Sequence, residues 1–476
     1  MPVTANKSLP LLMALALSAC AVGSDYHRPA PPAVSRYTNS DMTSTLTSGD
    51  ATTQNLKIGE TVSNQWWTLF HSPQMNAVMT EALANNQTLT AAKATLAKAQ
   101  AALRQAQGAY FPQIDANGRF QRDRAGNSQP PSNLYSVGAT ASYAPDVFGG
   151  TRRSVERQRA LAENQRYQLA AAYLTLTGNV VSQCIELASL KAQLAAISDI
   201  VAQDEKNRDL VQQKLNAGKA ARLDLLTAES QLANDRTQLA PLRQRVSVAR
   251  HALTVLVGKF PGEWTPPDFD ITKLTLPADL PVSLPSELVH QRPDILAAEA
   301  QLHADSAAVG IATADMFPQI TLSATGAYQS NSTNQIFTPA NLFWNLAAGI
   351  TAPIFHGGAL KAQQTQAREA FKASAALYQQ TVLEAFGQVA DTLRALQHDG
   401  ELLGAQKLAL DTAEAALKLQ RISYDAGKSD LLKLLDAERS YQQARLGYVR
   451  ADSQRYQDSA QLFLAMGGGW WPQVEQ

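Results

Sequence analysis

The sequence predicts a mainly helical protein that also carries a small membrane β-sheet, and two observations support this fold class. Two segments, 111–150 and 317–358, alternate apolar residues with small or polar ones, as strands of a β-hairpin do. Long segments rich in Ala, Leu and Gln, a composition typical of helices, flank each of the two hairpins. Helix, hairpin and helix therefore occur twice, as an internal two-fold repeat.

Both hairpins begin and end with closely similar residues. Phe-Pro-Gln-Ile begins at Phe111 and again at Phe317, and a Gly-Gly pair follows at 149–150 and at 357–358. Alternation is clearest in the last strand, where one face carries Leu342, Trp344, Leu346, Ala348, Ile350 and Ala352. Strands of about ten residues with one apolar face are typical of transmembrane β-barrels. A soluble sheet packed on a core is the alternative for the strands alone.

The membrane interpretation requires several copies of the chain. Four strands cannot close a barrel, and lipid tolerates no open sheet edge. Two copies supply eight strands, a size whose interior side chains fill, and three supply twelve, which leaves room for a channel. A homotrimer is thus the smallest assembly that both closes and conducts.

Composition excludes several classes of function. The 476 residues include 41 Lys and Arg and 41 Asp and Glu, so there is no basic excess to favour nucleic acid. The seven histidines are scattered and predict no metal site. His-Glu-x-x-His, Gly-x-Ser-x-Gly and paired Cys-x-x-Cys motifs are absent from the sequence, and Ile422 occupies the glycine position that a phosphate loop ending at Gly427-Lys428 requires. We expect no enzyme activity.

The first 19 residues predict a signal peptide. Lys7 supplies the positive charge, 9–17 form an apolar run too short to span a bilayer as a helix, and Leu17-Ser18-Ala19-Cys20 forms the processing site. This motif resembles a bacterial lipobox, in which Cys20 carries the covalent lipid that anchors the mature chain, and Ala21 favours the outer membrane. An ordinary secretory signal with an incidental cysteine is the alternative. The other cysteine, Cys184, is expected to be a buried thiol.

The remaining chain divides into five segments. Long proline-free stretches predict helices; a 65-residue one would measure roughly 95 Å and must pack beside similar helices. The expected segments are a lipidated tether at 20–63, a first repeat at 64–258, a proline-rich linker at 259–290, a second repeat at 291–466 and a tail at 467–476. The expected helices cover 73–108, 152–217, 223–258, a stretch from 292 to just before 317, 359–424 and 431–466.

Six short motifs, in a fixed order along the chain, together resemble one known family. They are Leu17-Ser18-Ala19-Cys20, Trp66-Trp67-Thr68-Leu69-Phe70, Phe111-Pro112-Gln113-Ile114, Arg292-Pro293-Asp294-Ile295, Phe317-Pro318-Gln319-Ile320 and Gly467-Gly468-Gly469-Trp470. In these motifs the chain resembles outer-membrane efflux lipoproteins of the TolC-like outer membrane factor family, in the NodT branch that works with RND pumps. One departure is Asn85-Asn86-Gln87, where the family often has an Asn-Pro-Asp-Leu-like helix start.

The resemblance implies an assembly and its partners. It implies a homotrimer with a twelve-stranded β-barrel in the outer membrane and a long α-helical barrel crossing the periplasm. Solutes such as drugs would pass from an inner-membrane RND pump through a periplasmic adaptor protein into this passive duct. The duct would be anchored by lipid and would contact outer-membrane lipid.

Two candidate sites follow from this resemblance. The turns after the long helices would be periplasmic tips that contact the adaptor; they comprise Asn216, Ala217, Gly218 and Lys219, and Asp425, Ala426, Gly427 and Lys428. Their alternative interpretation is simple glycine capping. Leu432, Asp436 and Arg439 would form the periplasmic gate, as an apolar neck and a ring of three carboxylates. An exposed Asp436–Arg439 pair on a solvated helix is the alternative there.

Two other functions stay open. Within transport, the chain could be the exit duct of a protein or peptide secretion system. In a different class, it could be a structural lipoprotein that spaces the outer membrane from the cell wall, although such a spacer needs no barrel strands. Drugs, aromatic acids, detergents and metal ions all remain possible cargo.

Overall fold

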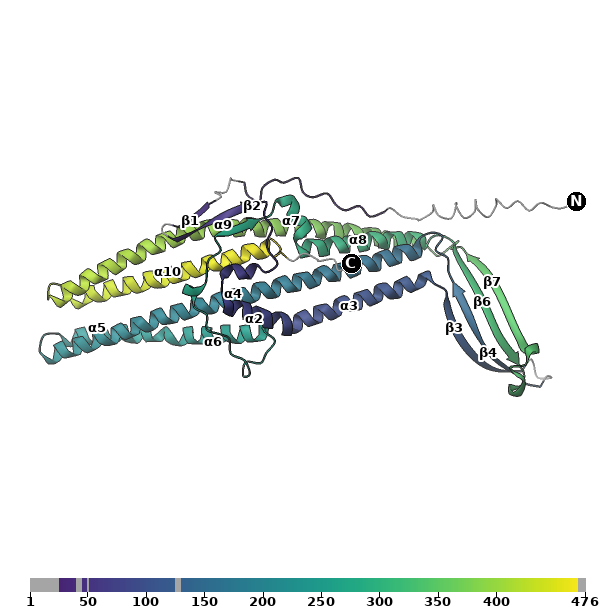
Figure 1. Ribbon diagram of the computed structural model, residues 1–476, viewed down its shortest axis with the longest axis horizontal. Coiled ribbons are helices and arrows are strands. Elements are labelled where there is room, and N and C mark those ends of the chain that lie inside the picture. The colour runs from purple at the N-terminus through teal and green to yellow at the C-terminus, as the bar shows by residue number, and fades with distance from the viewer. Residues whose placement is uncertain (1–24, 40–44, 49–50, 125–129, 470–476) are drawn as a thin grey trace. The chain divides into compact units, whose positions relative to one another are not determined.

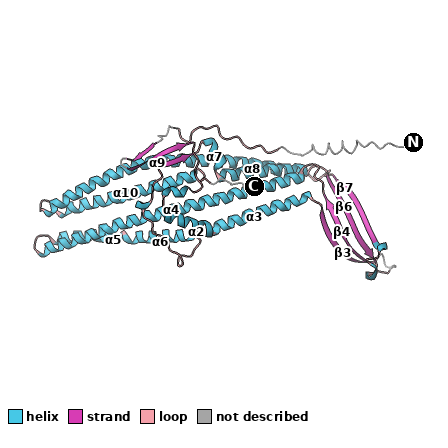
Figure 2. Cartoon of the chain, viewed as in Figure 1, coloured by secondary structure: helices cyan, strands magenta, loops and turns pink. Residues whose placement is uncertain are grey.

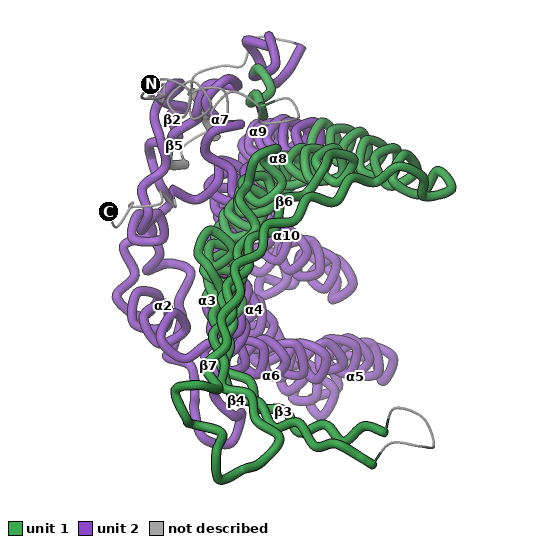
Figure 3. The backbone as a smooth tube through the Cα atoms, turned by 90° about the vertical axis from the view of Figure 1, so that its right-hand side faces the viewer, with its two compact units in different colours: residues 1–30, 94–167, 297–380 green, residues 31–93, 168–296, 381–476 purple. Residues whose placement is uncertain are grey.

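The computed structural model describes residues 25–39, 45–48, 51–124 and 130–469 (Figure 1). Helices, cyan in Figure 2, make up most of this part of the chain. The chain forms two compact units, each built from both halves of the sequence (Figure 3). Unit 1 holds 94–167, 297–380 and the segment before residue 31, and unit 2 holds the rest. The signal peptide and Cys20 lie outside the described residues.

Unit 1 contains one four-stranded antiparallel sheet. Its strands are β3 (Gln113–Asp123), β4 (Ser132–Tyr143), β6 (Gln319–Ser330) and β7 (Leu342–Thr351), in the order β3-β4-β6-β7. Both predicted hairpins are confirmed, and β4 pairs with β6 to join them. This central pairing requires a glycine, because a Cβ on Gly138 would lie 2.4 Å from the Cβ of Ala327.

Segments of α3 (Gln87–Gln107), α4 (Gly150–Asn216), α8 (Pro293–Ala314) and α9 (Ala359–Asp425) complete unit 1. Helix α8 approaches α4 closely, because Gly310 would place a Cβ only 2.8 Å from Cγ of Arg153. A polar contact joins the two helices, because Nε2 of His303 on α8 lies 2.9 Å from Oε1 of Glu156 on α4. Arg153 Nη1 holds that glutamate from within α4 by donating to its Oε2 at 2.7 Å.

The predicted long helices are confirmed in length. Helices α4 and α9 have 67 residues each, and α10 (Leu431–Ala465) returns beside α9 over 35 residues (Figure 1). The predicted single helix over 223–258 is wrong, since α5 (Arg222–Thr237) ends where α6 (Leu239–Leu256) begins. Pro241, in the first turn of α6, has no N–H to donate to the carbonyl of Thr237.

The described helices include none that combines the length and the apolar character needed to cross a membrane.

The predicted single helix over 73–108 is also wrong. It divides into α2 (Pro73–Asn85) and α3, with Asn86 extended between them. Leu89 N donates to Oδ1 of Asn86 at 3.0 Å, so Asn86 caps α3, and its Nδ2 donates to Leu256 O at 2.9 Å. Neither proline nor glycine marks this break in the sequence.

A second, small sheet lies in unit 2, where the sequence predicts a tether and an irregular linker. Strand β1 (Thr45–Ser48) pairs antiparallel with β2 (Ala51–Ile58), and β2 pairs parallel with β5 (Asp279–Val282). The expectation of an extended tether and an irregular linker, neither of them part of a sheet, is therefore wrong at β1, β2 and β5. Buried Gln54 helps to hold β2 in place, because its Nε2 donates to Pro277 O at 2.9 Å and to Ser459 Oγ on α10 at 3.0 Å.

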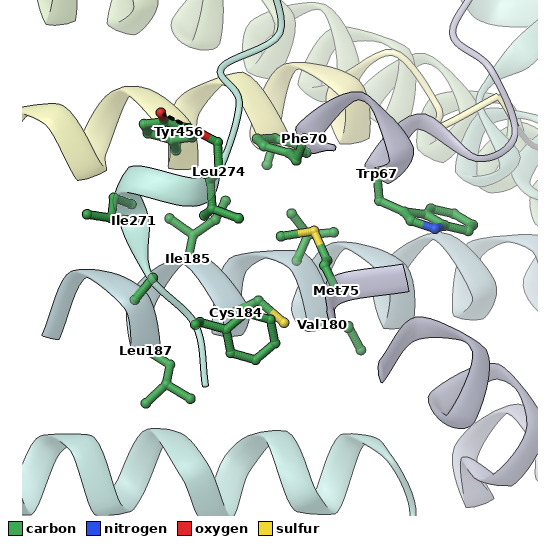
Figure 4. Packing of buried hydrophobic residues seen from close by; sticks show 14 of the residues in the cluster. Trp67, Phe70, Met75, Val180, Cys184, Ile185, Leu187, Ile271, Leu274 and Tyr456 are labelled. Carbon is green, nitrogen blue, oxygen red and sulfur yellow. Dashed lines mark hydrogen bonds between the residues drawn. The ribbon is translucent and has the colours of Figure 1, made fainter. Parts of the chain in front are cut away.

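The main apolar core of unit 2 packs the aromatic motif of the short helix η1 (Trp66–Phe70) against α2, α4 and α10 (Figure 4). Trp66 is fully buried and stacks on Phe463, with ring centroids 5.3 Å apart. Tyr456 lies at the same core, and its hydroxyl donates to Leu274 O at 3.1 Å. Each such side chain contributes about 1.5–3 kcal/mol by burial.

Cys184 is buried as predicted, and desolvation raises the pKa of its thiol. It lies on α4 among the same apolar side chains (Figure 4). A thiol that is neutral and removed from solvent has little nucleophilic reactivity. The second cysteine is therefore a packing residue.

Arg292, which begins the Arg-Pro-Asp-Ile motif, holds three elements of unit 2 together. Its guanidinium donates two hydrogen bonds to the carboxylate of Asp294, at 3.1 and 2.6 Å. It also donates to Ala465 O at the end of α10 and to Gln388 Oε1 on α9. Only a planar, five-donor group satisfies this arrangement, which explains Arg rather than Lys at the position.

Candidate functional site

The sheet of unit 1 carries one continuous apolar face. Strand register places Ile114, Ala116, Gly118 and Phe120 beside Ala141, Ala139, Val137 and Tyr135, and these beside the apolar residues of β6 and β7. In the single chain this face is open: Trp344, Leu346 and Ile350 are 71%, 72% and 70% exposed. Large apolar side chains on an exposed face fit a lipid environment. The soluble-sheet alternative, which needs a core against this face, finds none among the described residues.

The opposite face of the sheet is mainly polar or small, apart from Leu134 and Phe343. It carries Asp115, Asn117, Arg119 and Gln121 on β3, with Ser136, Thr140 and Ser142 on β4 and Thr321, Ser323 and Thr325 on β6. The hydroxyls of Thr140 and Thr325 lie 3.2 Å apart across the β4–β6 pairing. An apolar outer face and a polar inner face are the two surfaces of a channel wall.

Aromatic side chains in and around the two hairpins are proposed from the sequence for the membrane interfaces, and several of them are exposed on unit 1. The proposed set is Tyr110, Tyr135, Tyr143, Phe148, Tyr328, Phe343, Trp344 and Phe355. Phe355 is 87% exposed, and Tyr110 and Phe343 are partly so. Others pack locally, because Phe148 stacks on Phe317 with ring centroids 5.1 Å apart. The structure thus divides the proposed aromatic set into exposed and packed members.

The helix tips at Gly218 and Gly427 have the same backbone geometry. Both glycines have φ of 71°, in the left-handed region. Lys219 N donates to Lys214 O at 2.8 Å, and Lys428 N donates to Ser423 O at 2.8 Å, the hydrogen bonds that define a Schellman cap. The predicted glycine caps are confirmed. All eight proposed tip residues are exposed, as a docking surface requires.

Helices α5 and α10 begin differently after these caps. Asp430 caps α10, since Lys433 N donates to its Oδ1 at 2.9 Å, and this bond lowers the pKa of the carboxyl. At α5 the carboxylate lies inside the helix instead, where Asp224 Oδ2 accepts from Ala221 N at 2.8 Å. Both arrangements place negative charge at a helix N-terminus.

The two tips of unit 2 are joined behind their exposed turns. A small apolar cluster connects the four helices through Val211, Leu225, Ala228, Leu417, Leu431, Leu434 and Leu435. Beside it, Nζ of Lys214 on α4 lies 3.8 Å from the ring centroid of Tyr424 on α9. The two helical hairpins therefore contact each other close to their ends.

The three proposed gate residues lie on one exposed side of α10. Leu432 is 61% exposed, and Arg439 Nη1 donates to Asp436 Oδ1 at 3.4 Å. Such an exposed pair contributes only about 0–1 kcal/mol. The exposed Leu432 side chain and the exposed Asp436 carboxylate are available to face other copies of the chain. The Asp436–Arg439 pair also fits the alternative interpretation, an ion pair on a solvated helix.

Arg439 has a second partner that the sequence does not reveal. Its Nη2 donates to Oε1 of Gln231 on α5 at 3.3 Å, and Gln231 Nε2 donates to Asp235 Oδ2 at 2.7 Å. Asp235 is buried beside Asp204 of α4. Three helices thus connect the proposed gate to a buried acidic group.

Glu438, next to the gate residues in sequence, is buried rather than exposed. Asn207 Nδ2 donates to its Oε2 at 2.7 Å, and Arg421 Nη2 donates to its Oε1 at 3.2 Å. Burial raises the pKa of Glu438 despite these two donors. No sequence signal separates Glu438 from an ordinary surface glutamate, because its neighbours come from helices far apart in the chain.

Comparison with known proteins identifies the family. The outer membrane efflux protein family matches this chain over residues 78–259 and 284–468. The cation efflux system protein CusC of Escherichia coli O6:H1 is 30% identical over 472 residues, covering 98% of this chain and 99% of its own length. The pyoverdine export outer membrane protein OpmQ of Pseudomonas aeruginosa is 30% identical over 417 residues, covering 85% and 87%.

Solved structures agree with the sequence comparison. The outer-membrane channel OprN superimposes with a TM-score of 0.85 at 28% identity, covering 95% of this chain and 100% of OprN. Matched helices and strands along nearly the whole chain confirm the predicted TolC-like, mainly helical fold. The chain therefore belongs to the outer membrane efflux protein family and is the outer-membrane channel of an efflux system, extending into the periplasm.

Proposed function

We propose that the channel is a homotrimer whose three sheets close into a twelve-stranded β-barrel. The observation that carries this proposal is the sheet itself. Within the described residues, β3 and β7 each pair on one side only, so the sheet ends in two open edges beside an exposed apolar face. Lipid offers no hydrogen bonds to the unpaired N–H and C=O groups of such edges. Pairing β3 of one copy with β7 of the next satisfies these groups. Three copies close with room for a conducting bore.

The proposed working unit is a tripartite efflux system. An inner-membrane RND pump would deliver small solutes, drugs among them, through a periplasmic adaptor that contacts the exposed tips at 216–219 and 425–428. CusC and OpmQ are named for cation efflux and pyoverdine export, so relatives with comparable identity differ in cargo. The duct contributes a passage, and the pump supplies the energy and selects the solute.

Cys20 is proposed to carry the lipid anchor. The residues that follow it support an anchor on unit 1, because Arg153 Nη2 donates to Asp25 Oδ1 at 2.8 Å and Arg28 Nη2 donates to Glu299 Oε2 at 2.6 Å. Between them, Tyr26 stacks on His303 with ring centroids 4.3 Å apart. These contacts hold the start of the described chain on the unit that bears the sheet.

Labelling with a radioactive fatty acid tests the anchor. The chain has only two cysteines, so Cys184→Ser serves as the matched control. We expect the Cys184→Ser protein to keep the label and the Cys20→Ser protein to lose it. Label that persists in the Cys20→Ser protein contradicts the anchor.

Oligomeric mass and planar-bilayer conductance, measured on one detergent-extracted sample of the full chain, test the assembly. A trimer that inserts discrete channels supports the closed barrel. A monomer or dimer without conductance overturns the closed trimeric barrel. The two readouts together separate failure to assemble from failure to conduct.

A further inference from the structure

Asp204 of α4 is a buried carboxyl group without a hydrogen-bond donor. It is 2% exposed, and neither of its oxygens accepts a hydrogen bond from any described residue. It lines a cavity of about 550 Å³ in unit 2 formed by α4, α9 and α10. An ionised carboxylate in such a place is strongly unfavourable, so the group must be neutral or hold a ligand.

Asp235 of α5 lies beside Asp204 and, unlike it, has hydrogen-bond donors at both carboxylate oxygens. Its two oxygens accept hydrogen bonds from Gln231 Nε2 at 2.7 Å and from Gln238 Nε2 at 3.0 Å. Amide donors stabilise the ionised form of a carboxyl. The pair is therefore asymmetric, because Asp235 has two amide donors and Asp204 has none.

The other charges around Asp204 also favour its protonated, neutral form. Glu438 on α10 adds a further negative charge, and Arg421, the cation nearest to Glu438, is occupied by it at 3.2 Å. Arg445 is likewise occupied, donating to Asp199 Oδ2 at 2.9 Å. The charged side chains that line the cavity are Asp199, Glu414, Lys418, Arg421, Glu438 and Arg445. The described residues offer no group of three or more His, Cys, Asp or Glu placed to hold a metal ion, so a proton is the ligand that fits.

We propose that Asp204 and Asp235 form a proton-binding site whose occupancy is coupled to the periplasmic gate through Gln231. Gln231 uses both ends of its amide, because Nε2 donates to Asp235 and Oε1 accepts from Arg439 at 3.3 Å. Arg439 in turn donates to Asp436 at 3.4 Å. The coupling rests on the proposed gate at Leu432 and Asp436, whereas the proton site does not.

The direction of the effect follows from charge. With the proton bound, α4 and α5 are joined by the Asp204–Asp235 contact, and Gln231 holds Arg439 in place. When the proton leaves Asp204 for solvent, two buried carboxylates repel each other, and the contact opens. Burial, together with Asp235 and Glu438, raises the pKa of Asp204 to about 8. The closed arrangement is thus favoured at neutral and acidic pH and is lost above that value.

Two measurements on the full-length trimer test the site. Infrared spectroscopy at about pH 7, below the raised pKa, detects a protonated carboxyl group by its C=O stretching band. We expect the band in wild type and in Asp209→Asn, which removes an exposed acid of the same helix. We expect Asp204→Asn to lose the Asp204 contribution to the band. Wild-type and Asp204→Asn spectra that are identical overturn the proton site.

Single-channel conductance at about pH 6 and about pH 9 tests the coupling. Conductance should rise with pH in wild type and in Asp209→Asn, and should be low and independent of pH in Asp204→Asn, whose amide cannot ionise. An unchanged pH response in Asp204→Asn, beside a lost infrared band, overturns the coupling but not the site. A pH response that survives Gln231→Ala overturns the route through Arg439. Failure of the gate hypothesis itself is recognised separately. In that case the double variant Leu432→Ala with Asp436→Ala conducts as the wild-type protein does.

Discussion

Gly178 of α4 lies directly against Leu464 of α10: a Cβ on Gly178 would stand 2.5 Å from Cδ1 of Leu464. It is the single glycine in the 65-residue stretch after Thr151. A glycine costs a helix interior about 0.5–1 kcal/mol relative to alanine. Here the missing side chain is what lets α4 and α10 approach, so the local cost is offset by packing.

Replacing Gly178 with Ile should therefore destabilise unit 2. The added side chain meets Leu464 and must displace it, which costs about 1–3 kcal/mol of unfolding free energy. Thermal unfolding of the purified protein measures the loss as a lower melting temperature. Gly387→Ile on α9, where no atom lies within 4 Å of the added Cβ, is the matched control and should change stability less. Because Ile has a higher helix propensity than Gly, a Gly178→Ile protein as stable as the Gly387→Ile protein would contradict the close packing against Leu464.

The pairing of the two hairpins should depend on Gly138. A Cβ added there would contact Ala327 and would lie 2.5 Å from the carbonyl oxygen of Gly326. A backbone atom cannot move aside as the end of a flexible side chain can. We expect Gly138→Val to cost at least about 1–3 kcal/mol and to reduce the amount of trimer recovered from outer membranes. Gly118→Val on β3 of the same sheet meets no atom within 4 Å and should assemble normally. A normal yield of trimer for Gly138→Val contradicts the β4–β6 register.

The helix tips should matter for partner docking more than for assembly. Trp at Gly218 or at Gly427 adds bulk in open space, and the left-handed backbone adds roughly 1–2 kcal/mol of strain confined to the turn. We expect efflux, measured as drug resistance in cells that carry the pump and adaptor, to be abolished while trimer forms. Gly59→Trp is the control, since Gly59 also has positive φ and open space but lies away from the tips. Full resistance in both tip variants excludes the tips as the adaptor contact.

Removing the proposed gate should widen the closed end of the channel. We expect Leu432→Ala combined with Asp436→Ala to raise single-channel conductance, because both the apolar neck and the carboxylate ring are lost. The internal repeat supplies a control on α5. Leu223 and Thr227 lie 209 positions before Leu432 and Asp436, so they are their counterparts in the first repeat, and Thr227 has no carboxylate. Their double alanine variant should conduct as wild type does. An unaltered conductance in the Leu432 and Asp436 variant refutes the gate.

A second buried carboxyl predicts how stability depends on pH. Asp399 on α9 is 7% exposed, and burial, followed by the nearby Asp458, raises its pKa to about 8 from 3.8. A raised folded-state pKa stabilises the fold fully below pH 3.8, and this contribution is lost as pH rises through about 8. Melting temperature should fall between pH 5 and pH 9.

Asp399→Asn isolates this contribution. We expect the variant to be more stable than wild type at about pH 9 by roughly 1–3 kcal/mol, since a neutral amide replaces a buried charge. Asp391→Asn, an exposed acid of the same helix, should leave the pH profile as it is. A profile for Asp399→Asn that parallels wild type would mean that Asp399 is not the group that titrates.

Local patterns in the sequence determined much of this protein. Alternation placed all four strands of the unit 1 sheet and their apolar face, because neighbouring side chains of a strand point to opposite sides. The absence of proline placed α4, α9 and α10. Gly218 and Gly427 ended two of these helices, because a left-handed cap favours glycine. The two-fold repeat and the helix–hairpin–helix plan depend on nothing beyond such short-range rules.

Tertiary structure alone decided the contacts between distant segments. The pairing of β2 with β5, the break at Asn86 and the fit of Gly178 against Leu464 join residues more than 160 positions apart. The buried carboxyls are the sharpest case: Asp204 and the exposed Asp209 look alike as residues of one helix. What separates them is desolvation by helices α5, α9 and α10, a property of three-dimensional packing that no spacing within α4 encodes.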